Sequence, residues 1–267
     1  MRQESPVRNT PRPVALVTGA SSGIGREFCR QLAQRQYDLI VVARAAERLE
    51  ALGRELSDQH GITVESLPAD LSRDEGIALV AARIRQEPRL ALLVNNAGFG
   101  TKGRLASIPP GPQEAMLHLH VVACGLLAQA ALPGMVSRGR GGIINVSSVA
   151  SFVFSPGNVN YCATKAYLTV LSEGLATELE GTGVRVQALC PGFTHTEFHD
   201  RMHHDKSTIP AWMWLSAERV VRTSLETLER GGPVVCVPGL RYKLLVALIR
   251  LLPRTLLARA AAVHRKV

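Results

Sequence analysis

The sequence predicts an α/β fold, in which a doubly wound sheet of seven parallel strands has helices on both faces. Two observations indicate it. Short apolar segments rich in Val, Ile and Leu alternate with helical patterns along most of the chain, and most of these segments lack the polar alternation of a strand with one wet face. The expected strands are 14–18, 39–43, 62–67, 90–94, 142–146, 184–189 and 234–237. The expected helices lie near 24–36, 45–59, 74–86, 112–137, 160–180 and 217–230.

The chain length indicates one large domain. It has 267 residues, of which 46% are hydrophobic and 20% charged, which supplies a core and excludes a disordered chain. We expect a single Rossmann-type domain over 13–240, preceded by a disordered basic tail over 1–12 and followed by a basic amphipathic segment over 241–267. The long irregular stretch 193–216 is the expected substrate lid, because loops of that length in compact domains often cover binding sites.

The formal net charge of +9 comes from the two ends of the chain. Residues 241–267 carry seven cations and no acid, whereas the body is neutral overall. This distribution does not indicate a basic face across the fold, so no nucleic-acid partner is expected. If 241–267 is helical, Lys243, Arg250 and Arg254 would flank a broad apolar face. That segment could contact an anionic membrane, cover an apolar surface of the body, or pair subunits.

The five cysteines favour a reducing compartment, since the closest pair is 28 residues apart and none forms a disulfide or metal motif. The first residues lack the apolar centre of a signal peptide, and we expect no apolar run long enough to span a membrane. The expected location is therefore cytoplasmic, with membrane association through 241–267 as an open alternative. Three histidines at helical spacing (195, 199 and 203) are not expected to form a metal site.

A glycine-rich turn follows the first expected strand and reads TGASSGIG at 18–25. Glycines there would permit a tight turn, close approach of a pyrophosphate, and close packing of the next helix, whose N-terminus faces the anion. A purely structural turn is the alternative. The candidate cofactor contacts in this turn are Gly19, Ser21, Ser22, Gly23, Ile24 and Gly25.

The residue types after the second strand favour NADP(H) over NAD(H). An NAD enzyme would place an acid there for the ribose, whereas this chain has Arg44 and, one turn later, Arg48. Either cation could pair with a 2′-phosphate, although both could also be ordinary surface arginines. Asp70, followed by Leu71, could accept from the adenine amino group or cap a helix. The fourth strand ends in three further candidate cofactor contacts, Asn96, Ala97 and Gly98. The Asn96 amide could tie strands together or contact the cofactor, and Gly98 would leave room for the ribose.

A candidate reaction centre lies at the expected fifth strand and the helix after it. Tyr161 and Lys165 are four residues apart, which places them on one helix face. A nearby ammonium would lower the pKa of the tyrosine, so that Tyr161 could exchange a proton with a carbonyl or alcohol oxygen. Ser148 could hold the same oxygen as its charge changes.

The order and spacing of these motifs, together with Pro191-Gly192, resemble the short-chain dehydrogenase/reductase family, and in particular bacterial NADP-dependent oxidoreductases. The resemblance covers about 13–240. It implies that Tyr161 is the general acid/base, that Ser148 polarises the substrate oxygen, and that Lys165 lowers the tyrosine pKa and binds the nicotinamide ribose. It also implies that Thr196 binds the nicotinamide carboxamide and that Thr194 contributes a backbone contact.

One position departs from the family pattern. The family usually has an asparagine in the helix before the fifth strand, which positions a water for proton relay to the lysine, and this chain has His120 there. We expect histidine, which titrates near neutrality, to hold that water with altered pH dependence. The alternative is that the relay is lost, which would leave a slow enzyme, or a cofactor-binding scaffold or sensor with vestigial catalysis.

The expected function is therefore NADP(H)-dependent interconversion of a ketone and a secondary alcohol. The apolar lid, with Trp212 and Trp214, suggests a bulky hydrophobic substrate, although these tryptophans could serve only to pack the lid. The resemblance to bacterial reductases implies that this substrate could be lipid-like or acyl. By the resemblance we expect a homodimer or homotetramer.

Overall fold

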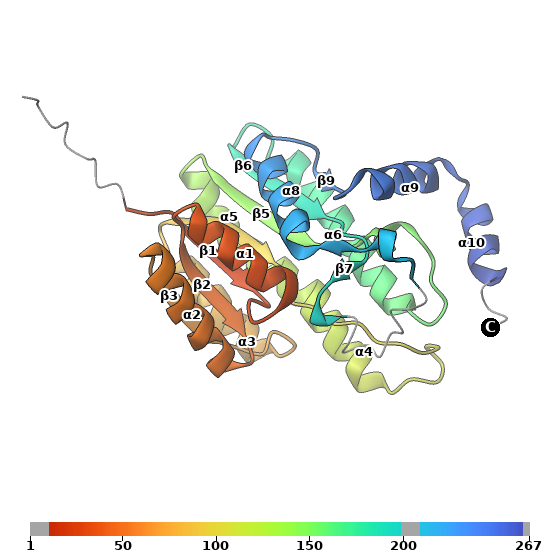
Figure 1. Ribbon diagram of the computed structural model, residues 1–267, viewed down its shortest axis with the longest axis horizontal. Coiled ribbons are helices and arrows are strands. Elements are labelled where there is room, and N and C mark those ends of the chain that lie inside the picture. The colour runs from red at the N-terminus through yellow and green to blue at the C-terminus, as the bar shows by residue number, and fades with distance from the viewer. Residues whose placement is uncertain (1–10, 199–208, 264–267) are drawn as a thin grey trace, which may run out of the picture.

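Seven strands form one parallel sheet in the computed structural model, which describes residues 11–198 and 209–263 (Figure 1). Their order is β3-β2-β1-β4-β5-β6-β9, and every pairing is parallel. This confirms the expected fold class, with strand ends shifted by at most two residues. The strands are β1 Val14–Thr18, β2 Asp38–Ala43, β3 Val64–Pro68, β4 Leu90–Asn95, β5 Gly141–Val146, β6 Val184–Leu189 and β9 Val235–Cys236.

Helices cover both faces of the sheet, which explains why the inner strands are apolar throughout. α1 (Gly23–Gln34), α2 (Ala46–His60) and α8 (Ala217–Glu229) bury their apolar sides in one core, on one face. On the other face, α3 (Asp74–Arg85), α5 (Cys124–Ser137) and α6 (Val159–Glu178) contribute to the second core. All five residues of β1 are buried, because β1 lies between these two layers.

A continuous helical stretch runs over Pro110–Ser137 and is made of α4 (Pro110–Leu117), a π-helical turn η1 (His118–Ala123) and α5. By length and composition it is apolar enough to cross a membrane, so the expectation that no segment would qualify is wrong. Met116, Leu127 and Met135 of this stretch are fully buried in the fold. Core packing therefore accounts for part of its apolar composition, since 44% of the apolar window is buried.

A small second sheet lies outside the main one and was not predicted. β7 (Thr194–His195) pairs with β8 (Leu215–Ser216), and a short helix η4 (Ala211–Met213) precedes β8. These elements bracket the expected lid, of which 199–208 lies outside the described residues. The two-residue strands are too short for hydrophobic periodicity to reveal them.

The C-terminal segment forms two helices, α9 (Leu240–Leu251) and α10 (Arg254–Val263), separated by Pro253. Tyr242 and Val246 of α9 are buried in the first core. The Tyr242 hydroxyl accepts a hydrogen bond from the Phe193 backbone N–H (3.0 Å) and donates one to the Met213 carbonyl (2.8 Å). Part of the segment thus covers the body and ties together the two ends of the lid. Most of the expected N-terminal tail, 1–10, lies outside the described residues.

Replacing Tyr242 by Phe is expected to lower the free energy of unfolding by about 1–3 kcal/mol, because it leaves the partly buried Phe193 N–H and Met213 carbonyl without their partner. Urea unfolding of the wild type and the variant measures this difference. The matched control is Tyr37→Phe, since the described part of the chain offers the Tyr37 hydroxyl no hydrogen-bond partner. Equal losses in both variants would contradict the role given to the Tyr242 hydroxyl.

Candidate active site

The candidate residues gather at one edge of the sheet because all seven strands are parallel. The segments after β1, β2, β3, β4, β5 and β6 therefore leave the sheet on the same side (Figure 1). The strand order reverses between β1 and β4, the place where ligands bind in open α/β sheets. The candidates at this edge are Gly19, Arg44, Asp70, Asn96, Ser148 and Gly192.

The glycine-rich turn between β1 and α1 has no room for side chains. Gly19 and Gly23 have positive φ angles of 66° and 54°. A Cβ atom on Gly25 would collide with the Gly19 carbonyl oxygen, and one on Gly23 would lie 3.1 Å from Cβ of Thr196. The turn thus brings Thr196, from far along the chain, against the start of α1.

The N-terminus of α1 faces this turn with its partial positive charge. Ser22 is the N-cap residue, and no acidic side chain lies in the first turn of the helix. The unpaired N–H groups of a helix start attract anions. Ser21 lies in the turn, and Ile24 packs its side chain against the first core. The arrangement suits a phosphate group.

Thr18 fixes the switch point and was not singled out in the sequence. Its hydroxyl accepts hydrogen bonds from the backbone N–H groups of Asn96 and Ala97, both at 2.9 Å. The Asn96 side chain adds a second link, since its amide nitrogen donates to the Thr18 carbonyl at 2.8 Å. Asn96 therefore ties β1 to β4, which is one of its two expected roles. The only sequence signal for Thr18 was its place directly before Gly19.

Of the two arginines after β2, Arg44 is exposed at the end of the strand, whereas Arg48 forms an ion pair with Glu197 of the lid (3.3 Å). Arg48 thus has a carboxylate partner within the protein. Both side chains of the Arg48 pair are more than half exposed, so the pair contributes little stability. Arg44 is the better placed of the two for an added anion.

Asp70 does not cap a helix, because the N-cap residue of α3 is Arg73. Asp70 instead accepts hydrogen bonds from the Ser72 backbone N–H (3.0 Å) and hydroxyl (2.7 Å). Burial raises the pKa of Asp70, but these bonds and the nearby Arg44 outweigh burial and lower the pKa overall. The side chain of Leu71 lies in the second core, so only its backbone could contact a ligand.

Ser148, Tyr161 and Lys165 come together between β5 and α6. The Ser148 hydroxyl hydrogen-bonds the Tyr161 side chain. Lys165 is 5% exposed, donates to the Val146 carbonyl (2.8 Å), and lies 5.7 Å from the Tyr161 ring centroid. Helical spacing of four residues places the tyrosine and the lysine on one face, as expected.

Burial dominates the titration of both groups. Burial raises the pKa of Tyr161 to about 12, although the Ser148 hydrogen bond acts in the opposite direction. Burial lowers the pKa of Lys165 to about 8. In the chain by itself, desolvation of the phenol therefore outweighs the lowering of its pKa that was expected from the nearby ammonium.

His120 does not have the free nitrogen that the expected relay requires. Its Nε2 accepts from the Phe99 backbone N–H (3.2 Å), so Nδ1 carries the proton and donates to the Thr164 hydroxyl (2.9 Å). Burial, and then the charge of Lys165, lower the pKa of His120 well below its usual value. His120 is thus a neutral, fully hydrogen-bonded core residue, and the expectation that it titrates near neutrality is wrong.

Two further candidate glycines contact protein groups. A Cβ atom on Gly98 would lie 2.7 Å from Nε2 of His120, and one on Gly192 would collide with the Tyr242 ring. Pro191 is buried, and its carbonyl accepts from the Val149 backbone N–H (3.0 Å). The space expected for a ribose at Gly98 is therefore bounded by the histidine ring.

Aromatic rings surround the Tyr161 phenol. His120 meets it edge-on, with ring centroids 6.0 Å apart, and Phe198 of the lid lies 6.0 Å away on a tilted plane. Phe99 packs edge-on against His120. Thr194, the expected backbone contact, is buried in β7. The surroundings of the Tyr161 phenol are therefore largely apolar.

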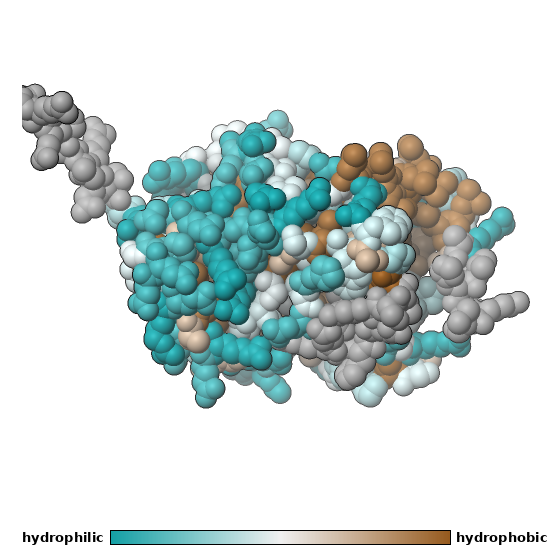
Figure 2. Space-filling view, viewed as in Figure 1, coloured by the Kyte–Doolittle hydropathy of each residue, from teal (hydrophilic) through white to brown (hydrophobic). Residues whose placement is uncertain are grey.

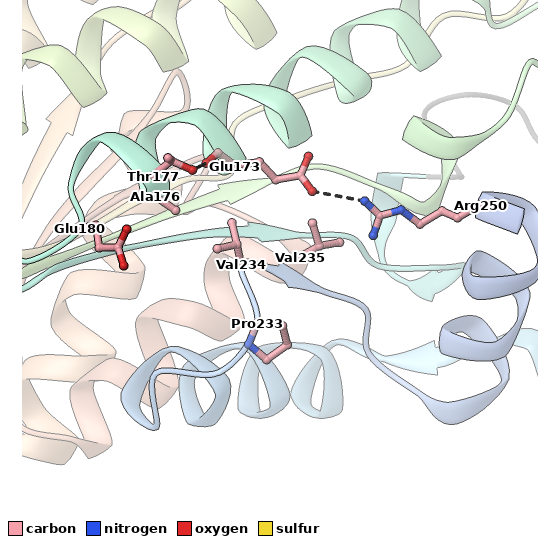
Figure 3. A pocket seen from close by; sticks show the side chains of 8 residues that line it. All are labelled: Glu173, Ala176, Thr177, Glu180, Pro233, Val234, Val235 and Arg250. Atoms are coloured by element: carbon pink, nitrogen blue, oxygen red, sulfur yellow. Dashed lines mark hydrogen bonds and ion pairs between the residues drawn. The ribbon is translucent and has the colours of Figure 1, made fainter.

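Two other features lie apart from these side chains. A groove of about 510 Å³ is bordered by α6, residues 233–235 and Arg250, and none of Ser148, Tyr161 and Lys165 lines it (Figure 3). Within 11–198 and 209–263, no group of three or more His, Cys, Asp or Glu side chains could hold a metal ion. The expected absence of a metal site is not tested further, because His199 and His203 lie outside those ranges.

Replacing Lys165 by Met is expected to stabilise the fold near neutral pH. The pKa shift from 10.5 to about 8 means that burying the ammonium costs about 3 kcal/mol. Below about pH 8 the lysine is charged in both the folded and the unfolded state, so the full cost of burying its charge applies. This cost disappears as the pH rises toward about 10.5, because the folded-state lysine loses its proton first.

Urea unfolding of both proteins at about pH 7 and about pH 10 measures this gain, which should shrink at the higher pH. Lys102→Met is the control, because Lys102 is exposed and its loss should change stability by less than about 0.5 kcal/mol. A gain that is independent of pH would contradict the role given to the buried charge.

Comparison with known proteins is consistent with this geometry. The pattern of the short chain dehydrogenase family matches residues 13–207. An uncharacterized oxidoreductase of Myxococcus xanthus is 36% identical over 184 residues, which are 68% of this chain and 72% of that protein. A 3-oxoacyl acyl-carrier-protein reductase of Staphylococcus aureus is 35% identical over 190 residues, 70% of this chain and 77% of that protein.

Two solved structures share nearly the whole fold. A short-chain dehydrogenase from Sphingobium yanoikuyae in complex with NADPH has a TM-score of 0.82 and 37% identity, with 89% of this chain and 94% of that one covered. A bulky-bulky ketone specific alcohol dehydrogenase from Comamonas testosteroni has a TM-score of 0.78 and 30% identity, with 92% and 96% covered. The chain therefore belongs to the short-chain dehydrogenase family and is an NAD(P)-dependent oxidoreductase.

Proposed function

We propose that this protein interconverts a hydrophobic ketone and the corresponding secondary alcohol with NADP(H). The observation that carries the proposal is the group formed by Ser148, Tyr161 and Lys165, in which the serine hydroxyl bonds the tyrosine and the ammonium lies 5.7 Å from its ring. This group lies at the same edge of the sheet as the glycine-rich turn, which follows β1.

The residues at this edge fit a dinucleotide. The α1 N-terminus and the positive φ of Gly19 and Gly23 suit a pyrophosphate, and Asp70 retains acceptor oxygens for an adenine amino group. Thr196, next to Gly23, would hold the nicotinamide end. When bound, NADP(H) supplies or accepts the hydride.

The chain's own residues would handle the proton. Tyr161 gives its phenolic proton to the oxygen of the ketone, or takes one from the alcohol. Ser148 holds that oxygen by a hydrogen bond that strengthens as charge develops on it. Lys165 provides a positive charge in a dry environment, where its electrostatic effect on the phenolate is large.

Preference for NADP(H) over NAD(H) rests on Arg44. It is exposed at the end of β2, at the position where an acid would otherwise accept from the ribose. A guanidinium there can bind a 2′-phosphate through two hydrogen bonds. The NADPH complex of the Sphingobium relative supports this assignment.

A hydrophobic substrate is supported by the rings around Tyr161. Phe198 lies near the phenol, and farther along the lid Trp214 stacks on His195 with centroids 4.8 Å apart. The relatives include proteins named for bulky ketones, hydroxysteroids and 3-oxoacyl groups.

A cofactor-binding sensor without turnover is the second candidate. The observation that favours it is His120, whose two nitrogens are both bonded within the protein and so offer no free position for a relay water. NADPH oxidation with a panel of hydrophobic ketones separates the two: binding of NADPH without oxidation of it would identify the sensor.

The homo-oligomer, the cytoplasmic location and contact of 241–267 with a membrane remain predictions. A homodimer or homotetramer is supported by apolar side chains on the outer sides of α5 and α6, where Leu126, Tyr167 and Val170 are exposed. Exposed apolar groups gathered on neighbouring helices are typical of subunit contacts. Light scattering of the purified protein measures the oligomeric state.

Replacing Tyr161 by Phe is expected to reduce turnover at least about a hundredfold, because it removes the proton donor. NADPH affinity, measured by fluorescence titration, should stay nearly unchanged. Tyr167→Phe is the matched control, since Tyr167 lies on the same helix with its side chain partly exposed. Wild-type turnover in Tyr161→Phe would refute the assignment of the acid.

Replacing Arg44 by Asp is expected to lower kcat/KM for NADPH by about tenfold or more, through loss of a phosphate partner and gain of a repelling charge. The kcat/KM for NADH should stay the same or rise. Arg54→Asp on α2 is the control, as it changes charge equally at an exposed position away from the strand end. Parallel losses with both cofactors would rule out a 2′-phosphate contact.

A further inference from the structure

The outer surface of the C-terminal helices is apolar. Figure 2 shows hydrophobic atoms gathered over α9, whereas the side of the molecule with α1, α2 and α3 is mainly hydrophilic. Leu251 is 82% exposed and Leu240 70% exposed. The exposed leucines of this surface, here called the leucine face, are Leu240, Leu244, Leu245, Leu248, Leu251, Leu252 and Leu256.

Most of the leucine face lies on α9, and the opposite side of this helix packs against the body. Tyr242 and Val246 of α9 are buried against the body, and Arg250 anchors the end of the helix to Glu173 of α6 by an ion pair of 3.3 Å (Figure 3). Leu244, Leu248 and Leu251 follow one another at intervals of one helical turn on the outward side. Packing of α9 onto this chain therefore does not account for the leucine face.

Cations border the leucine face; α9 and α10 themselves contain no acid, and Glu173 of α6 pairs with Arg250 alone among these cations in the described part of the chain. The chain has no Asp or Glu after residue 229. Arg241, Lys243 and Arg250 belong to α9, and Arg254 and Arg259 to α10. A helix that combines an exposed apolar side with basic flanks has the composition of segments that lie in the headgroup region of a bilayer.

The same surface continues to the lid. Arg241 lies over the ring of Trp212 at 5.8 Å from its centroid, and Trp212 itself is 63% exposed. Arg254 lies over the ring of Phe154, which is also exposed. Tyr242, on the inner side of the same helix as Arg241, hydrogen-bonds the backbone of both Phe193 and Met213. The leucine face therefore borders the edge of the lid.

We propose that the leucine face binds the surface of an anionic lipid membrane, with its leucines and Trp212 at the boundary of headgroups and acyl chains. A second copy of this chain is a poorer occupant. In a two-fold dimer a patch meets itself, so the cations of α9 and α10 would oppose one another. Anionic headgroups complement the same charges. The inference rests on the proposed function in one respect, namely that a hydrophobic ketone dissolved in the bilayer would reach the lid directly.

Vesicle binding by the full-length protein tests the proposal without requiring turnover. The probes are vesicles of phosphatidylcholine alone and of phosphatidylcholine with phosphatidylglycerol, assayed by co-sedimentation. We expect binding to the anionic vesicles to be at least about tenfold tighter, and to weaken as salt is added. The double variant Leu244→Glu/Leu248→Glu should bind at least about tenfold more weakly than the wild type.

The control is Leu79→Glu, because Leu79 is an exposed leucine on α3, away from α9 (Figure 1). It should bind vesicles as the wild type does. Equal vesicle binding by the double variant and the wild type would overturn the proposal, as would equal binding to both kinds of vesicle. If the wild type is a dimer and the double variant is a monomer, the leucine face is a contact between copies. That result would also overturn the proposal.

Tryptophan fluorescence gives a second readout on the unaltered protein. The chain has two tryptophans, of which Trp212 is exposed and Trp214 is 9% exposed. Anionic vesicles should shift the emission to shorter wavelength, and brominated lipid should quench it; Trp212→Phe should abolish both effects. Emission unchanged by anionic vesicles would refute the proposal even if the double variant failed to fold. Failure of the proposed function would appear separately, as no NADPH oxidation with any ketone despite vesicle binding.

Discussion

The contact between Thr18 and the end of β4 is the constraint on which the site depends. One hydroxyl accepts the backbone N–H groups of Asn96 and Ala97, and this fixes the point where the order of the strands reverses. The glycine-rich turn, which leaves β1 at Thr18, is thereby held against the residues after β4. Because all strands are parallel, the ends of β2, β3, β5 and β6 open onto the same edge, and the chemistry of the chain is concentrated there.

Burial of charge is the second physical theme. Lys165 is buried and donates a hydrogen bond to one carbonyl. The loss of water around its ammonium lowers its pKa to about 8. The same burial raises the pKa of Tyr161 and keeps His120 neutral. These groups therefore reduce the stability of the chain or add nothing to it, as is common where a protein keeps reactive groups away from water. His120 differs from Tyr161 and Lys165, because its two hydrogen bonds give it a structural role.

The C-terminal helices connect the lid to the outer surface. Tyr242 joins Phe193 to Met213 from the inside of α9, and Arg241 reaches Trp212 from the outside. The net charge of +9 is a property of the chain ends, and three of its cations, Arg241, Lys243 and Arg250, lie on α9, the helix that touches the lid. Charge, lid and apolar surface belong to one continuous region of the molecule.

The sequence by itself determined the sheet, its helices and the strand-end motifs, because apolar runs, glycine spacing and Tyr161-to-Lys165 spacing are local signals. Only the tertiary structure decided the partners of those residues. Arg48 meets Glu197, Gly192 meets Tyr242, and both nitrogens of His120 are occupied by groups distant in the chain. The direction of the Tyr161 pKa was likewise beyond the sequence, since desolvation depends on what encloses a side chain and not on its neighbours along the chain.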